Sequence, residues 1–304
     1  MSFRIILSVV IIFLSLVRNV FCNEEVKKEQ AWNPYSVGPV TGWTAPVCEK
    51  GQLIAQPFYF YNHTRGTFDS GGNYNGLGGE NRKNQMVEQL CLQYGITDRL
   101  EIKAQMAYQQ NQLKQYGQTA YSKGFADSYA FLRYCMIEES GFLPHLSLMY
   151  QLRIPTGKFQ KVDPDKLGTD LMGNGSYDNG VGVILTKKFR PWVIHFDGVY
   201  NVPSVAKVDG IKIKNSPYLN LDFAVEYFLP KGFNLMLELN GYLQDDKREA
   251  GVKIESSNTD YLIVCPAVGW SNEKIQTLLA YQRTVVGMNT DANDSVVLTF
   301  LYSF

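Results

Sequence analysis

The chain has 304 residues, and its 29 basic and 29 acidic side chains give a formal net charge of zero. A balanced charge provides no basic surface for nucleic acid, so we expect no nucleic-acid partner. The five cysteines are spaced too widely for a disulfide framework or a metal-ligand cluster, and we predict no metal and no cofactor.

Residues 1–22 have the pattern of an export signal. Arg4 supplies a positive charge, and residues 5–17 form an apolar core that ends at Arg18. This core is shorter than the roughly twenty residues that a membrane-spanning helix requires. We predict that residues 1–22 are a cleaved signal peptide. Lipidation of Cys22 is the alternative, but residues 19–21 lack the small side chains that such a site needs.

The next segment, residues 23–50, is polar and then rich in proline and glycine. Such composition is typical of irregular structure. We predict a periplasmic N-terminal segment over residues 23–50, followed by one β domain over residues 51–304.

From residue 52 onward, apolar and polar residues alternate in segments long enough to cross a bilayer as tilted strands. The segments cover residues 52–62, 84–95, 99–110, 125–137, 143–154, 178–189, 191–202, 217–228, 232–244, 259–270, 274–285 and 294–304. Their connections alternate between long, polar loops and tight turns. We therefore predict an all-β fold, a transmembrane antiparallel up-and-down β-barrel of about 12 strands with short periplasmic turns and long extracellular loops. A soluble jelly roll or double sandwich is the alternative.

The strand over residues 217–228 shows which face meets lipid. Leu221 and Phe223 alternate with Asp222 and Glu226. A charge at the middle of a bilayer costs about 2–4 kcal/mol, so the polar set must face the lumen. Some residues fit this pattern poorly. Glu88 and Arg283 fall on the lipid face unless they lie near the outer rim, and Pro57 and Pro266 interrupt strands.

Charged residues on the inward face are the candidate pore residues. They are Lys103, Arg133, Arg153, Asp197, Asp222, Glu226 and Glu238. The acidic ones lie on consecutive strands and the basic ones on another sector. Opposed walls of unlike charge around an open pore would select small polar molecules or ions. Alternatively, the same residues pair across a narrow lumen and fill it.

The last strand ends in an aromatic residue, Phe304, which we predict is read by the outer-membrane assembly machinery. The other predicted partners are membrane lipid, lipopolysaccharide and a small-molecule solute. Two pairs hint at an enzyme instead. His145 and Ser147 have a hydrolase-like spacing, and His195 lies beside Asp197 on one face. Neither pair comes with a complete catalytic set, so we predict no enzymatic activity.

Four short motifs occur in the order Gly95-Ile-Thr-Asp-Arg-Leu-Glu-Ile102, Gly124-Phe-Ala-Asp-Ser128, Leu152-Arg-Ile-Pro-Thr-Gly157 and Tyr281-Gln-Arg-Thr284. Together the chain from residue 50 to 304 resembles a family of outer-membrane transporters named for the meta-cleavage pathway of phenol degradation. The resemblance implies a barrel in the outer membrane of a Gram-negative bacterium that imports small, often aromatic or hydrophobic compounds. It carries over no binding or catalytic residues. We predict a channel or transporter for small molecules with a polar lumen. The alternative is a structural or receptor-like barrel whose lumen is filled by side chains.

Overall fold

The computed structural model describes residues 32, 34–36 and 38–304. The predicted signal peptide lies outside these residues. The chain separates into a unit of Met1–Asn33 and a unit of Pro34–Phe304, and the barrel belongs to the second. No helix in the described part of the chain is both long and apolar enough to cross a membrane.

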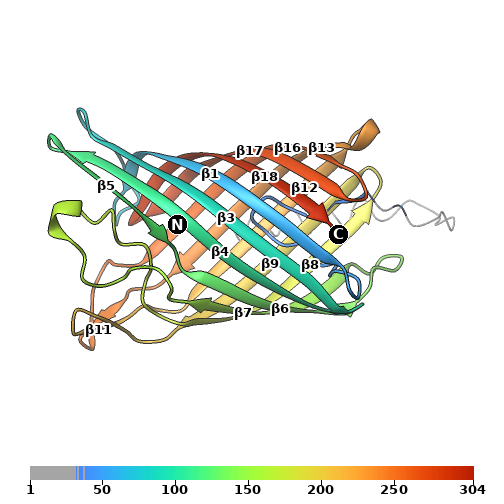
Figure 1. The fold of residues 1–304 in the computed structure, drawn as a ribbon, viewed down its shortest axis with the longest axis horizontal. Helices are drawn as coiled ribbons and strands as arrows, with labels where there is room; N and C mark the ends of the chain where they lie inside the picture. Colours follow the sequence, from blue (N-terminus) through green and yellow to red (C-terminus); the bar gives the residue numbers. More distant parts are fainter. Residues whose placement is uncertain (1–31, 33, 37) are drawn as a thin grey trace. The chain divides into compact units, whose positions relative to one another are not determined.

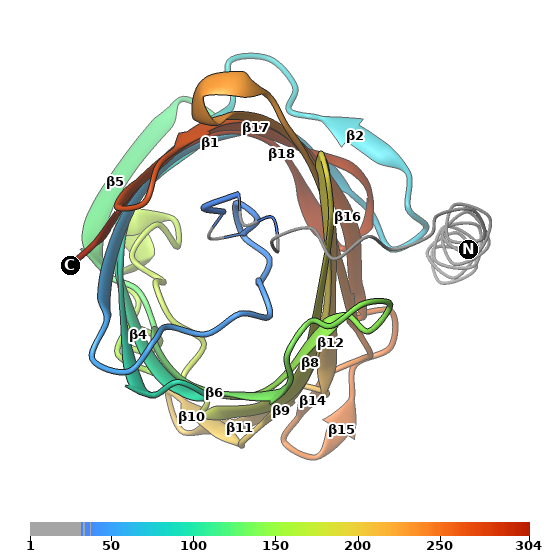
Figure 2. The same cartoon turned by 90° about the vertical axis from the view of Figure 1, so that its right-hand side faces the viewer.

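The second unit is a closed barrel of antiparallel strands (Figures 1 and 2). The strands of the wall are β1 (Leu53–Phe68), β3 (Arg82–Thr97), β4 (Leu100–Gln115), β6 (Ser128–Ile137), β7 (His145–Ile154), β8 (Asp178–Phe189), β9 (Trp192–Pro203), β12 (Tyr218–Phe228), β13 (Phe233–Gln244), β16 (Thr259–Ser271), β17 (Ile275–Met288) and β18 (Thr290–Ser303). The main sheet has 14 strands, and without the loop strands β2 and β5 it leaves 12 around the wall. Because β18 pairs with β1, no edge stays open. The predicted fold class is confirmed.

The long connections lie at one end of the barrel and contain the remaining elements (Figure 1). These are β2 (Tyr74–Gly76), β5 (Gln118–Phe125), β10 (Ala206–Val208), β11 (Ile211–Lys214), β14 (Arg248–Glu249), β15 (Val252–Lys253) and the 3-10 helix η1 (Pro164–Lys166). A second 3-10 helix, η2 (Pro230–Gly232), forms one of the short turns. The prediction ended the first strands too early, since β1 continues to Phe68, and β4 and β5 form a hairpin across residues 111–124. These extensions are polar on both faces, so they show no apolar alternation.

Side chains alternate between the lumen and the outer surface as predicted. On β13, Leu235 and Leu237 are each 49% exposed. Asn234 and Glu238, which flank them in the sequence and point to the opposite face, are almost fully buried. The two strand prolines have a physical explanation. The β1–β18 pairing omits Pro57 and the β16–β17 pairing omits Pro266, so each proline faces a gap in a hydrogen-bond ladder where no N–H is needed.

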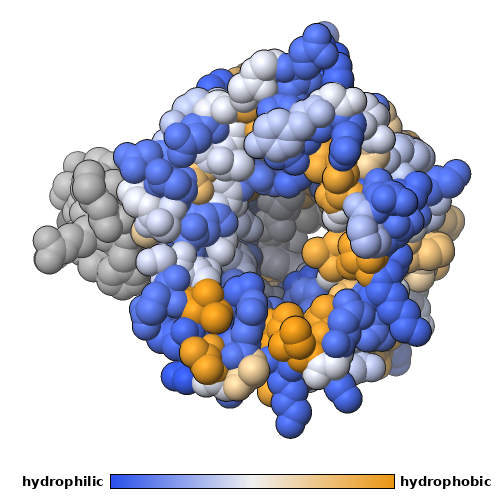
Figure 3. Space-filling model, turned by 90° about the vertical axis from the view of Figure 1, so that its left-hand side faces the viewer, coloured by the Kyte–Doolittle hydropathy of each residue, from blue (hydrophilic) through white to orange (hydrophobic). Residues whose placement is uncertain are grey.

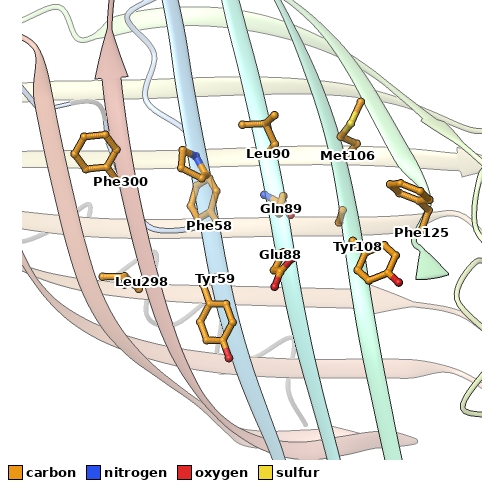
Figure 4. Close-up of a pocket in the computed structure, with 12 residues that line it drawn as sticks. Phe58, Tyr59, Glu88, Gln89, Leu90, Met106, Tyr108, Phe125, Leu298 and Phe300 are labelled. Carbon is orange, nitrogen blue, oxygen red and sulfur yellow. The ribbon is translucent and has the colours of Figure 1, made fainter. Parts of the chain in front are cut away.

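Glu88 and Arg283 remain on the outer side of the wall. Glu88 lies between its cross-strand neighbours Tyr59 and Tyr108. It is one of the residues that line a cavity of about 510 Å³ over β18, β1, β3 and β4 (Figure 4). Arg283 has Asp294 as its ion-pair partner, with Nε 3.7 Å from Oδ1. Two tyrosines therefore flank the Glu88 carboxylate, and the Asp294 carboxylate pairs with Arg283.

Candidate functional site: the barrel lumen

The chain that precedes β1 enters the barrel. Residues 36 and 38–48, which we call the plug, lie inside the ring of strands (Figure 2). Ala45 is completely buried, and its N–H donates to Thr186 Oγ1 at 2.8 Å. The sequence predicted a periplasmic N-terminal segment over residues 23–50, and it did not show that this part of the segment lies in the lumen. The plug is rich in glycine and proline and has no periodic pattern that could have revealed its position.

Glu238 on β13 holds the middle of the plug. Its carboxylate accepts backbone N–H groups of Val40 at 2.8 Å, Thr41 at 3.1 Å and Gly42 at 2.7 Å. It also accepts the Thr41 hydroxyl at 2.7 Å. Hydrogen bonds to an ionised acceptor are roughly twice as strong as neutral ones, so this carboxylate is the strongest single anchor of the plug.

The neighbouring carboxylates complete an acidic wall. Asp197 accepts the N–H of Trp43 at 2.8 Å. Asp222 lies opposite Asp197 across β9 and β12, and Asn240 donates to both Asp222 and Glu238 at 2.7 Å. The prediction that Asp197, Asp222 and Glu238 meet on one wall agrees with this geometry. Their partners, however, are the plug and an amide rather than the basic residues of the opposite sector.

A buried ion pair holds the end of the plug. Arg133 on β6 donates to Glu101 on β4 through Nη2 at 2.7 Å and Nε at 3.0 Å, and both side chains are at most 3% exposed. Arg133 also donates to the carbonyl groups of Thr44 and Pro46. Glu101 accepts the N–H of Cys48 at 2.7 Å. Burial and the nearby Glu101 carboxylate raise the pKa of the Cys48 thiol.

The aromatic side chain of the plug packs against the same sector. The Trp43 ring centroid lies 4.8 Å from that of Phe131, in an edge-on arrangement. The ammonium group of Lys103 lies 4.3 Å from the Trp43 ring centroid, a favourable cation–π distance. Lys103 and Arg133 therefore contact the plug instead of facing an open pore.

Glu226 joins the N-terminal end of the plug to the wall. It accepts the Ser36 hydroxyl at 2.6 Å and the Asn234 amide at 2.7 Å. His195 Nε2 lies 2.8 Å from the same carboxylate, so His195 contacts Glu226 and not Asp197. The structure thus gives no support to His195 and Asp197 as an enzyme-like pair.

The other enzyme-like pair, His145 and Ser147, also has different contacts. Ser147 donates its hydroxyl to the Ala45 carbonyl at 2.6 Å, which makes it a plug contact. His145 Nε2 lies 3.1 Å from Cys135 Sγ. His145 and Ser147 therefore do not form a nucleophile and its base.

Arg153, the last of the predicted pore residues, lies nearer the long loops. It forms ion pairs with Asp127 at 2.7 Å and Asp178 at 3.6 Å. Asp127 also accepts the N–H groups of Gly157 and Asn174, both at 3.0 Å. One buried carboxylate thus fixes both ends of the loop over residues 155–177. Sequence reasoning missed Glu101, Asp127 and Asp178 as functional candidates.

The short sequence motifs mark these anchoring points. Gly95 exchanges backbone hydrogen bonds with the segment before β1, and a Cβ on Gly95 would lie only 1.9 Å from the Glu49 carbonyl oxygen. Asp98 accepts the N–H of Lys50 at 3.1 Å. The first motif therefore fixes the junction between the plug and β1. The second and third motifs supply Asp127, Arg153 and Gly157 of the loop anchor. In the sequence these motifs look like turns, and nothing in that pattern shows that Asp127, Arg153 and Gly157 lie together in the fold.

Replacing Asp127 with Ala should release the loop over residues 155–177. The loop loses two backbone hydrogen bonds and the Arg153 ion pair, so local opening becomes easier while the wall strands keep their pairing. We expect trypsin to cleave at Lys158 and Lys166 about tenfold faster than in the unmodified protein. The matched control is Asp163→Ala, since the Asp163 carboxylate caps η1 by accepting the N–H of Asp165, and its backbone hydrogen bonds are kept in the variant. Equal cleavage rates for the two variants would contradict the proposed anchor.

The family model for "Putative MetA-pathway of phenol degradation" matches residues 94–300. The crystal structure of the COG4313 outer membrane channel from Pseudomonas putida F1 is similar, with a TM-score of 0.70, 15% sequence identity, and coverage of 88% of this chain and 100% of that chain. The translocator domain of the autotransporter NalP from Neisseria meningitidis gives a TM-score of 0.46 at 10% identity, covering 84% of this chain and 90% of that one. No curated protein matches the sequence. The chain has the fold of an outer-membrane channel, and with two thirds of its length matched it belongs to the family described as the MetA-pathway of phenol degradation.

Proposed function

We propose that this protein is an outer-membrane channel for the uptake of small molecules, and that it conducts when the plug leaves the acidic wall. The observation that carries the proposal is the set of backbone N–H groups that Glu238 and Asp197 hold in the lumen. These contacts are hydrogen bonds rather than covalent links, so they can break and reform. The plug is therefore suited to act as a gate.

A second candidate function is a structural or receptor-like barrel with a permanently closed lumen. It is favoured by the tight packing at the plug, where a Cβ on Gly42 would lie only 3.2 Å from Asp197 Oδ2 and Asp222 Cβ. In this alternative the long loops carry the activity. The aromatic or hydrophobic character of the solute remains a prediction from the family resemblance.

Conductance of the purified protein in planar lipid bilayers separates the two functions. A gated channel should show a small resting conductance with brief transitions to a larger state, since thermal motion displaces the plug from time to time. A second readout is swelling of liposomes that contain the protein in solutions of small solutes. A folded barrel with neither conductance nor solute flux at any applied voltage would favour the closed alternative.

The cellular location and processing are also part of this proposal. We expect cleavage after the predicted signal peptide, residues 1–22, and insertion among the lipids and lipopolysaccharide of the outer membrane. The mature protein should partition with the outer membrane and run faster on a gel unheated than boiled, because a closed β-barrel resists detergent until heated. Recovery in the soluble periplasmic fraction would contradict the location, and the mass of the mature chain checks the cleavage site.

Deleting Phe304 should impair assembly in cells more than stability. Its side chain is 70% exposed, and its N–H donates to the Leu53 carbonyl at 2.9 Å. Loss of an exposed side chain usually changes stability by about 0.5 kcal/mol or less. We therefore expect a clear fall in the folded yield from cells, with nearly unchanged thermal stability of the barrel that does form. A normal yield from cells would show that Phe304 is not an assembly signal.

A further inference from the structure

Two of the long connections join to form a small sheet of their own. The strands β10 and β11 come from the connection after β9, and β14 and β15 come from the connection after β13. The order is β10-β11-β14-β15, and Lys214 on β11 lies opposite Arg248 on β14. Figure 3 shows this end of the molecule, where hydrophilic residues surround a central hollow. We call the four-stranded unit the loop sheet.

Both hairpins of the loop sheet are specified by their turns. Asp209 and Gly210 join β10 to β11 with φ values of 48° and 89°, and Ala250 and Gly251 join β14 to β15 with φ values of 50° and 87°. Positive φ at both central residues is the mark of a type I′ turn, whose twist matches that of the flanking strands. A two-residue turn of this kind also fixes the register. The side chains of the loop sheet are therefore held in a defined arrangement.

One face of the loop sheet is basic on every strand. Residues that lie opposite each other in an antiparallel pair share a face, as do residues two apart in one strand. Lys207 lies opposite Lys212, and Arg248 lies opposite both Lys214 and Lys253. Because Lys212 and Lys214 are two residues apart, all five side chains point to the same side, and all five are exposed.

The opposite face of the loop sheet is mainly apolar. Its residues are Ala206, Val208, Ile211, Ile213, Glu249 and Val252. Ala206 is only 1% exposed, whereas Ile211 and Val252 beside the turns are 54% and 66% exposed. The β10 end therefore packs against the protein through the apolar face, and the basic face is left to solvent.

The charge of the basic face is only partly compensated. Lys253 has two carboxylate partners, Asp246 at 3.0 Å and Glu255 at 3.1 Å. Within residues 32, 34–36 and 38–304, no carboxylate forms an ion pair with the other lysines of this face, which are Lys207, Lys212 and Lys214. Like charges directly opposite each other on a sheet are unfavourable. An anion on the basic face would relieve this repulsion.

The loop sheet lies at the rim of the barrel rather than over its mouth. In the view along the barrel, β10, β11, β14 and β15 lie at or outside the ring of wall strands (Figure 2). In an outer membrane, this rim is surrounded by lipopolysaccharide, whose core sugars carry phosphate groups. Lysine and arginine are strong phosphate donors, and arginine can bind with two parallel hydrogen bonds. A row of basic side chains therefore matches several phosphates on one oligosaccharide.

We propose that the basic face of the loop sheet binds the phosphorylated core of a neighbouring lipopolysaccharide molecule. The lysines of β10 and β11 contact the phosphates as point charges, and Arg248 supplies the two-donor contact. The inference rests on the proposed outer-membrane location and assigns a partner to two of the long connections. It does not depend on movement of the plug.

The test is calorimetric binding at low salt to the full-length protein, folded in uncharged detergent micelles. The probe is the water-soluble core oligosaccharide left when the acyl chains of lipopolysaccharide are removed, so the apolar barrel wall cannot contribute. The comparator is the same oligosaccharide without its phosphates. Each basic residue near an anionic surface changes binding about fivefold. Combining Lys207→Gln, Lys212→Gln and Lys214→Gln should therefore weaken binding of the phosphorylated form about a hundredfold.

The matched control removes the same charge from the short-turn end. It combines substitutions of three exposed lysines, Lys50→Gln, Lys231→Gln and Lys274→Gln, and should bind like the unmodified protein. A second control keeps the charge of the loop sheet with Lys207→Arg, Lys212→Arg and Lys214→Arg, and should bind at least as tightly as the unmodified protein. The faster migration of unheated samples on a gel checks that every variant is folded.

Equal binding of the phosphorylated and phosphate-free oligosaccharides would overturn the inference. Equal losses in the two glutamine variants would do so as well. Tighter binding of heparin, a sulfated polymer, than of the phosphorylated core would assign the face to a soluble polyanion instead. Conductance and membrane fractionation are measured on the same protein. A protein that conducts and partitions with the outer membrane but does not bind the core disproves this inference alone. A protein that binds the core and never conducts disproves the channel instead.

Discussion

Replacing Glu238 with Gln is expected to open the channel. The variant keeps the size of the side chain but removes the charge, and its one carbonyl oxygen cannot accept at both positions. With that oxygen in place of Oε1, the NH2 group faces the N–H of Val40, which needs an acceptor. Hydrogen bonds to a charged group contribute about 1.5–3 kcal/mol each, so we expect the docked position of the plug to lose about 3 kcal/mol of stabilisation. That energy shifts a two-state equilibrium about a hundredfold toward the displaced plug. The measurement is the open probability of single channels in planar bilayers.

Asp222→Asn is the matched control for this experiment. Asp222 lies on the same acidic wall, and its carboxylate bonds to Asn240 instead of a plug N–H. Both variants remove one negative charge, but only Glu238→Gln removes plug contacts. Equal increases in open probability would indicate that relief of repulsion within the acidic wall matters, and not the plug anchor.

The two variants also test the earlier idea of a charge-selective pore. In a salt gradient, the reversal potential reports the preference for cations over anions. If the acidic wall lines the open path, each substitution should reduce cation preference, because it removes a charge from the conducting route. An unchanged reversal potential in a conducting channel would place the selective path elsewhere.

The barrel could be predicted from the sequence because the polarity of successive residues in a wall strand depends on whether each side chain faces lumen or lipid. Asp222 and Phe223 differ in polarity because one meets the lumen and the other meets lipid, and this alternation recurs around the wall apart from exceptions such as Glu88 and Arg283. Tight turns between the strands then determine which of them pair. No knowledge of distant residues is needed for either inference.

The plug could not be predicted because the hydrogen bonds that hold its middle come mainly from its backbone. Val40, Thr41 and Gly42 are held through backbone N–H groups, which every residue except proline carries. The acceptor Glu238 lies almost two hundred positions away in the chain. A sequence pattern can show that Glu238 faces inward, but it cannot show what Glu238 meets there.

The ion pairs were predicted only in part for a similar reason. Alternation placed Arg133 on the inner face, and Glu101 shares the face of Lys103 two residues further on, but the pattern does not give the relative height of these residues along the barrel. The register between β4 and β6 sets that height and places the two residues directly opposite each other. Pairing within one sector therefore replaced the pairing across the lumen that the sequence suggested.

Replacing Glu101 with Gln is expected to destabilise the barrel strongly. The Arg133 charge would then lie buried with no anionic partner, since the carbonyl groups of Thr44 and Pro46, the Trp43 ring and the introduced amide are all neutral. Removing one member of a buried ion pair typically costs about 3–5 kcal/mol. For a domain of this size, that loss corresponds to a fall of about 10 °C in the thermal midpoint. The measurement is the temperature at which the unheated gel band converts to the unfolded one.

Two further variants test whether the loss of stability arises from leaving a charge buried without a partner. Glu138→Gln removes the partner of Arg99 in an exposed pair, with a distance of 3.0 Å and more than half of each side chain accessible, and should shift the midpoint by only about 1 °C. The double variant Glu101→Leu with Arg133→Met removes both charges and should recover most of the stability lost in Glu101→Gln, because no unpaired charge stays buried. It still lacks the bonds to Cys48, Thr44 and Pro46, so its resting conductance should exceed that of the unmodified protein. A double variant as unstable as Glu101→Gln would show that the pair acts through packing and not through its charges.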